Sequence, residues 1–148
     1  MDQRPESVKR ALSPNRIVVI GRRLFRPMML RTGIAAELEV PGRRTGNVCH
    51  TILIPWEVDG VHYLMSQYGV TDWVRNLRAA GGGQLRHKGS TLAFSAIEVE
   101  GEERDRVLAA FRAKADKLLS RDFERLPNPA DHPTFRVDPI KGAGTTQA

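Results

Sequence analysis

Cysteine is almost absent from this chain, since Cys49 is the only one among 148 residues. An intrachain disulfide needs two cysteines, and a multi-cysteine metal site needs more, so both are excluded. No apolar run approaches the roughly 20 residues of a membrane-spanning helix, and no signal peptide is visible at the N-terminus. These absences fit a reducing compartment, and we expect a cytoplasmic protein.

Familiar catalytic signatures are missing as well. No Ser/His/Asp or paired-carboxylate arrangement is recognisable, and Gly81-Gly82-Gly83 is not followed by the Gly-Lys-[Ser/Thr] of a phosphate-binding loop. We therefore expect this glycine run to be a flexible turn. His50 and His62 have no fixed spacing to cysteine or aspartate, so we expect ordinary strand histidines and no metal site.

Positive charge is concentrated at one end of the chain. The net charge is +6 at pH 7, residues 1–31 contain eight Lys or Arg against two acidic residues, and the two signs balance in the remainder. This distribution disfavours a nucleic-acid-binding domain with a broad basic face, so we expect no nucleic-acid partner. The length predicts a single domain over residues 32–140, preceded by a basic arm at 1–31 and followed by a disordered tail at 141–148.

The basic arm contains a candidate amphipathic helix. Ser13-Pro14 resembles a helix start, Pro27 should end the helix, and residues 14–26 alternate apolar side chains with arginines. Such a helix can lie on the anionic inner face of a membrane, as a peripheral contact. Alternatively, it packs on the rest of the protein with its arginines in solvent.

The middle of the chain reads as β structure. Strands are expected at 36–40, 48–58, 61–65, 84–86, 91–99 and 134–137. Asp59-Gly60 is a strong two-residue hairpin signal, and Pro55 suggests an edge position or a bulge. A helix is expected at 101–120 and a loop at 121–133. The pattern predicts a mainly β fold with flanking helices.

The segment from Met65 to Leu77 reads as a strand end, a glycine turn and a helix start in succession. Thr71 or Asp72 can serve as the N-cap. The first turn of a helix offers unpaired N–H donors and a partial positive charge to an anionic or carbonyl-bearing ligand. The alternative is a capped surface helix with Trp73 turned into the core.

A basic turn, Gly42-Arg43-Arg44-Thr45-Gly46, precedes this junction by one hairpin, so both loops can meet at one end of a sheet. Adjacent guanidinium groups flanked by glycines suit the binding of phosphate or carboxylate groups. The alternative is a hairpin tip whose arginines only improve solubility.

The basic turn and the strand-to-helix junction together form a more specific pattern than either one alone. A G-R-[RK]-[ST]-G turn, a hairpin and then S-x-x-G…D-W-x-R-N-L resembles the deazaflavin-dependent nitroreductase family. The resemblance runs from about Glu37 to Val99 and resumes at residues 133–137. It implies a split β-barrel of the FMN-binding type, coenzyme F-420 as cofactor, and a hydride transfer to a small organic acceptor such as a quinone, nitroaromatic or activated alkene.

The resemblance also implies which residues bind the cofactor. The basic turn would hold its anionic tail and the junction would line the deazaflavin pocket. The residues that match are Arg43, Arg44, Thr45, Gly46, Ser66, Gln67, Gly69, Asp72, Trp73 and Asn76.

This sequence departs from the family pattern in two places. Cys49 or His50 and Gln67 occupy positions that are often basic in characterised members. Tyr68 is a candidate proton donor.

The alternative function is that of a barrel of the same fold that binds FMN, haem or another tetrapyrrole, with or without enzymatic activity. The fold also suggests a homodimer.

Overall fold

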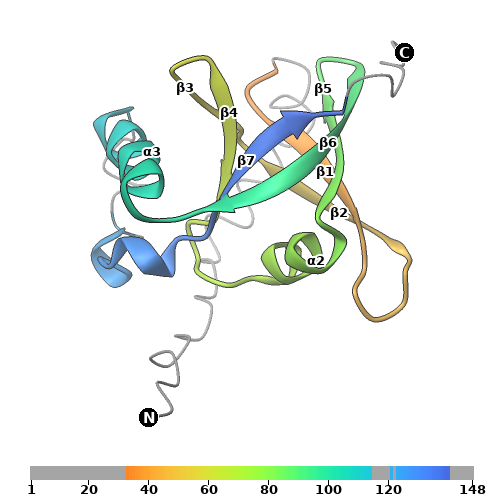
Figure 1. Cartoon of the computed structure of the whole chain (residues 1–148), viewed down its shortest axis with the longest axis horizontal. Coiled ribbons are helices and arrows are strands. Elements are labelled where there is room, and N and C mark those ends of the chain that lie inside the picture. Colours follow the sequence, from red (N-terminus) through yellow and green to blue (C-terminus); the bar gives the residue numbers. More distant parts are fainter. Residues whose placement is uncertain (1–32, 115–120, 122, 141–148) are drawn as a thin grey trace.

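The computed structural model describes residues 33–114, 121 and 123–140. The predicted basic arm, its candidate helix at 14–26 and the tail at 141–148 lie outside the described residues. Seven strands form one antiparallel sheet in the order β2-β1-β5-β6-β7-β4-β3, which curves around the core (Figure 1). The strands are β1 (Ala36–Pro41), β2 (Val48–Leu53), β3 (Trp56–Val58), β4 (Val61–Met65), β5 (Gly82–His87), β6 (Ser90–Val99) and β7 (Thr134–Pro139).

Strand β1 shows how the sequence directs its two faces. Leu38 and Val40 are 1% and 2% exposed, whereas Glu37 and Glu39 point to the other face and are only partly buried. β1 pairs with β2 on one side and β5 on the other. This alternation confirms the strand predicted at 36–40 and gives this part of the sheet one apolar and one polar surface.

The predicted β-rich segment 48–58 forms two strands. Residues 54 and 55 interrupt it, and β3 then pairs with β4 at the opposite edge of the sheet from β2. The break falls at Pro55, which lacks the N–H that a continuous ladder requires. Asp59 and Gly60 both have positive φ, of 53° and 79°, which confirms the predicted hairpin turn.

The glycine run is not the flexible turn that we expected. Gly81 ends α2 (Asp72–Ala80) in the left-handed conformation, with φ of 72°, and Gly82 and Gly83 begin β5. A Cβ on Gly82 would overlap the carbonyl oxygen of Phe94, and one on Gly83 would lie 2.5 Å from the carbonyl oxygen of Glu39. The run is therefore the end of α2 followed by the start of β5, where β1 and β6 approach so closely that only glycine fits.

Helix α3 (Gly101–Lys114) confirms the first part of the helix expected at 101–120; residues 115–120 lie outside the described part. The loop expected at 121–133 is wrong in two places. Residues 123–125 are helical, and Pro129–Asp131 form a 3-10 helix, η1. Phe123 packs at 5.0 Å on the ring of Phe111, and Asn128 caps η1 by accepting from the N–H of Ala130. Tertiary packing and the cap therefore outweigh the loop signal of the prolines.

The core lies inside the curved sheet, and α2 covers one end of it (Figure 1). Val74 and Leu77 of α2 are fully buried against the inner face of β1. Helix α3 packs elsewhere, through Leu108 and Phe111, against Met65 and Trp56. Among the described helices, none has the length and apolar character needed to cross a membrane. The basic turn meets α2 at this end, which brings part of the predicted site together.

Candidate functional site

A cavity of about 370 Å³ lies where the basic turn meets α2. A volume of this size is at the lower end of the range for small-molecule sites, so it can hold part of a large cofactor. Its lining residues are Gly42, Arg43, Arg44, Thr45, Cys49, His50, Thr51, Asp72, Trp73 and Asn76. The structure thus unites the basic turn and the start of the helix, as their order along the chain suggested.

The backbone of the basic turn is held by its own hydrogen bonds. The N–H of Gly46 donates to the carbonyl oxygen of Gly42 at 2.8 Å, and the N–H of Gly42 donates to that of Asn47 at 2.7 Å. Gly46 has φ of 74°, which a glycine adopts without a steric penalty. The hydroxyl oxygen of Thr45 accepts from the N–H of Asn47 at 3.2 Å. Thr45 and Gly46 therefore shape the turn, and Gly46 does not line the cavity.

Arg43 fastens this turn to α2. Its backbone N–H and its Nη1 both donate to Oδ1 of Asn76, at 3.2 and 2.8 Å. Its Nη2 also donates to Oδ1 of Asp72 at 3.3 Å. Asn76 is 6% exposed, one helical turn after Asp72, so its side chain is a fixed anchor. Much of the hydrogen-bonding capacity of Arg43 is thus used within the protein.

Arg44 differs sharply from its neighbour. It forms no hydrogen bond or ion pair within the described residues, and it lines the same cavity. Its guanidinium group is therefore available to a ligand, with five N–H donors in a planar fork. The carboxylate of Asp72 is 82% exposed and is engaged by Arg43. Arg44 consequently leaves the cavity with an excess of positive charge.

The strand-to-helix junction lies beside the cavity and is stabilised from within. The hydroxyl of Ser66 donates to the carbonyl oxygen of Gly69 at 2.5 Å, and Gly69 has φ of 84°. Ser66 and Gly69 therefore form the turn and do not line the cavity. Gln67 and Tyr68 are not among the lining residues either.

Two polar atoms of the junction are buried without a partner. Thr71 is the N-cap of α2, as predicted, but its side chain makes no capping hydrogen bond. Its Oγ1 and the Oε1 of Gln67 are buried and accept no hydrogen bond within the described residues. Buried polar atoms are rarely left unpaired because each costs on the order of 1–3 kcal/mol. Both residues lie between β4 and α2, beside the cavity and not in its lining.

For Trp73 the sequence left two alternatives, a place in the ligand site and a place in the core, and the structure shows that its side chain takes part in both the cavity wall and the core. It lines the cavity, and it also packs against the core, where its ring centroid lies 6.0 Å from that of Phe135. One part of the indole therefore supports the fold while another part of its surface faces the cavity. Aromatic rings in this position suit a flat cofactor.

The cofactor-binding residues predicted from the sequence leave out Gly42, Cys49, His50 and Thr51, which also line the cavity. Cys49 and Thr51 lie opposite Val40 and Leu38 of β1, and so on the inner face of the sheet. The two-residue alternation of β2 could have identified them. His50, between them, also lines the cavity.

A buried histidine outside the cavity holds the junction in place. His132 is 0% exposed, and its Nδ1 and Nε2 lie 3.0 and 2.7 Å from the carbonyl oxygens of Ser66 and Leu126. Its ring stacks on Phe123 at 4.4 Å. No local sequence signal distinguishes this histidine, because its partners lie in other segments of the chain.

Comparison with solved structures shows the fold. The chain is similar to an F420-H2 dependent reductase, FDR-A, with 20% identity and a TM-score of 0.57 over 71% of this chain and 94% of that chain. It is also similar to HutZ, the haem storage protein of Vibrio cholerae, with 15% identity and a TM-score of 0.59 over 79% and 89%. A third structure, a domain-swapped dimer, has 18% identity and a TM-score of 0.53 over 82% and 99%. These likenesses confirm the mainly β split-barrel fold expected from the sequence.

Sequence comparison identifies the family. No curated protein matches the chain. A model of the F420H(2)-dependent quinone reductase family matches residues 18–122, which include the basic turn, the junction and α2. The match covers most of the chain and confirms the resemblance on the motifs described above. This chain therefore belongs to the F420H(2)-dependent quinone reductase family.

Proposed function

We propose that this protein binds coenzyme F-420 between the basic turn and α2 and reduces a small organic acceptor. The observation that carries the proposal is the cavity of about 370 Å³ in which Arg44 is free while Arg43 is tied to α2. The family match supports the cofactor class. The same match supports quinones as the first acceptor class to test, ahead of nitroaromatics and activated alkenes.

The residues present fit an anionic, flat cofactor. Arg44 supplies an unpaired guanidinium for phosphate or carboxylate oxygens, and Trp73 supplies an aromatic face. The side-chain oxygens of Gln67 and Thr71 are buried at the junction and do not line the cavity, so they would reach a ligand only if the junction moved. The cavity holds one part of such a molecule, and the junction beside it offers polar atoms for another.

Each residue then has a distinct role in binding. Arg44 would hold the anionic tail, whereas Arg43 and Asn76 position the turn that carries Arg44. When bound, the reduced cofactor supplies the hydride. The protein contributes position, charge matching and partial exclusion of water. Tyr68 remains our proposed proton donor; it does not line the cavity, so this role requires the ligand to extend along the junction.

Titration of the purified full-length chain tests the cofactor assignment. We expect F-420 to bind with saturable fluorescence quenching, and FMN and haem to bind at least about tenfold more weakly. Oxidation of reduced F-420 should then accelerate when a soluble quinone is added. Tighter binding of FMN or haem than of F-420 would establish the alternative, in which the same barrel carries a different flat ligand.

We further propose a homodimer. The similar structure that is a domain-swapped dimer supports this assembly. Sedimentation at micromolar concentration should give a species of twice the chain mass. A monomer at all concentrations would refute the dimer without affecting the cofactor assignment.

A further inference from the structure

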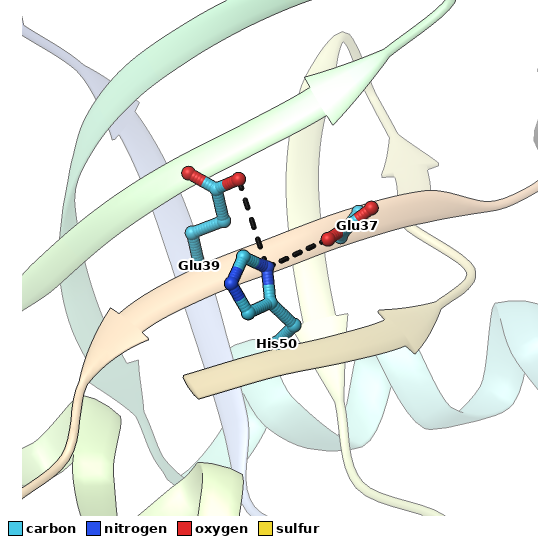
Figure 2. Close-up of side chains that lie close together, drawn as sticks. All are labelled: Glu37, Glu39 and His50. Carbon is cyan, nitrogen blue, oxygen red and sulfur yellow. Dashed lines mark hydrogen bonds and ion pairs between the residues drawn. The ribbon is translucent and has the colours of Figure 1, made fainter. Parts of the chain in front are cut away.

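Three side chains that can bind a metal ion converge on the outer face of β1 and β2 (Figure 2). The Nδ1 of His50 lies 2.7 Å from Oε1 of Glu37 and 3.7 Å from Oε1 of Glu39. All three ligand atoms lie within 4.8 Å of one another. Among the residues that the structure describes, no other group of three His, Cys, Asp or Glu side chains is this compact.

The strand register produces this convergence. Glu39 lies directly opposite His50 in the antiparallel β1–β2 pair, and Glu37 lies two residues further along β1 on the same face. Opposite and diagonal side chains on one face of a sheet are within reach of each other. The strand backbones therefore hold the three side chains together, with no loop involved. A site on paired strands is more rigid than one on a loop.

The separations match the requirements of a small divalent cation. Zinc binds histidine nitrogen and carboxylate oxygen at about 2.0–2.2 Å, so tetrahedral ligand atoms are about 3.3–3.6 Å apart. The 3.7 Å separation is close to this range, whereas the 2.7 Å separation is that of a hydrogen bond. Binding an ion would replace this hydrogen bond by metal–ligand bonds from His50 and Glu37. Solvent can supply a fourth ligand, because the His50 side chain is 49% exposed.

Electrostatics favour a cation at this point. The side chains of Glu37 and Glu39 are only 18% and 19% exposed, so two carboxylates lie close together with limited hydration. Arg86 approaches Oε1 of Glu39 at 3.4 Å and balances one of them. Within the cluster, the carboxylate of Glu37 is paired only with His50. A divalent ion bound through neutral His50 would compensate both carboxylates more fully.

We propose that Glu37, Glu39 and His50 form a binding site for a divalent transition-metal ion of the zinc type. The ion joins edge strand β2 to β1, three residues from the basic turn. The ion therefore strengthens the pairing of β2, which begins just after the basic turn, with β1. The role is structural, and it requires no change in the proposed cofactor chemistry. His50 links the two sites, since its residue also lines the cofactor cavity.

Calorimetric titration of the full-length, tag-free, chelator-treated chain with Zn²⁺ tests the proposal. We expect one ion per chain, and an increase in the melting temperature when the ion is present. Changing His50→Ala, Glu37→Gln or Glu39→Gln should each weaken zinc binding by at least about tenfold. The two glutamine variants keep the side-chain shape, so the fold should persist in them.

His62→Ala is the matched control. His62 also faces a glutamate on a hairpin, with Nε2 3.6 Å from Oε2 of Glu57, but in the described part of the chain it belongs to no group of three ligand side chains. Its loss should leave zinc binding unchanged. The proposal is overturned if Zn²⁺ does not bind, or if binding survives all three site variants. Titration of F-420 into the two glutamine variants distinguishes this outcome from failure of the cofactor assignment, because Glu37 and Glu39 do not line the cofactor cavity, whereas His50 does.

Discussion

Arg43 and Asn76, 33 positions apart in the sequence, are joined by two hydrogen bonds to one oxygen atom. Both the backbone N–H and the Nη1 of Arg43 donate to Oδ1 of Asn76, at 3.2 and 2.8 Å. A loop and a helix are thereby held at a fixed distance. Two adjacent arginines, which look equivalent in the sequence, therefore have different surroundings: Arg43 is bonded to α2, whereas Arg44 lines the cavity without a partner among the described residues.

Replacing Arg44 should weaken cofactor binding without destabilising the fold. A charge-assisted hydrogen bond contributes about 1.5–3 kcal/mol, so Arg44→Ala should reduce F-420 affinity by roughly tenfold or more. The free energy of unfolding should change by less than about 0.5 kcal/mol, because the side chain has no partner among the described residues. Fluorescence titration and urea denaturation measure the two quantities. Arg75→Ala, an exposed change on α2, is the control; equal affinity in the Arg44 and Arg75 variants would contradict the assignment.

Replacing Asn76 should affect both stability and binding. Asn76→Ala leaves the N–H of Arg43 without its partner, which should cost about 1–3 kcal/mol of unfolding free energy. Cofactor affinity should fall as well, because the turn is no longer fixed. Asn76→Asp keeps an acceptor oxygen beside Arg43 and should restore most of both properties. If the alanine variant is destabilised but binds F-420 normally, Asn76 has no role in positioning the site.

Gly82 should not tolerate a larger side chain. Its missing Cβ makes room for the carbonyl oxygen of Phe94 on the neighbouring strand. Gly82→Ala should therefore lower the free energy of unfolding by about 1–3 kcal/mol, since backbone atoms must move apart. Urea denaturation checks this value. The comparison variant is Ala80→Gly, at the exposed end of α2, where a loss below about 1 kcal/mol is expected. Equal losses in both variants would show that β5 can shift.

Tyr63 should make the protein sensitive to alkaline pH. Burial raises the pKa of Tyr63 above its usual value near 10, and the hydrogen bond from its hydroxyl to Glu103 raises this pKa further. The folded chain therefore holds this proton more tightly than the unfolded chain does. The resulting stability is complete below about pH 10 and is lost as the pH rises through the folded pKa.

Tyr63→Phe isolates this contribution. The variant should be less stable by about 1 kcal/mol at pH 8, because a hydrogen bond is lost, and its stability should decline less steeply above pH 10. Chemical denaturation at several alkaline pH values measures both effects. Parallel curves for the two proteins would mean that Tyr63 does not titrate with unfolding.

Deleting residues 1–31 tests the proposed membrane contact of the basic arm. Eight basic residues are removed, and each contributes about 1 kcal/mol near an anionic surface. The full-length chain should sediment with anionic vesicles at low salt and less so at high salt, whereas the truncated chain should stay in solution. Affinity for F-420 should change little, because the cavity residues remain. A truncated chain that unfolds, or a full-length chain that ignores the vesicles, would favour a helix that packs on the barrel.

The sequence identified the elements of this site through local rules. Asp59-Gly60 predicted the hairpin that separates the two loops, and the motifs around Arg43 and Trp73 predicted the family. Local rules failed at Gly82, where an apparent flexible turn is a strand. The reason is that a glycine can either relax a chain or allow close approach, and only the neighbouring strand decides which.

Pairing between distant segments decided the rest. The sequence by itself determined which faces of β1 are apolar or acidic, which turns need positive φ, and which residue types can meet an anionic cofactor. It could not show that Arg43 is occupied and Arg44 free, because the partner Asn76 lies on a helix. Nor could it show that His50, judged to be an ordinary strand histidine, faces Glu37 and Glu39. Those relationships depend on strand register and helix placement, which are set by the packing of the whole core and not by spacing along the chain.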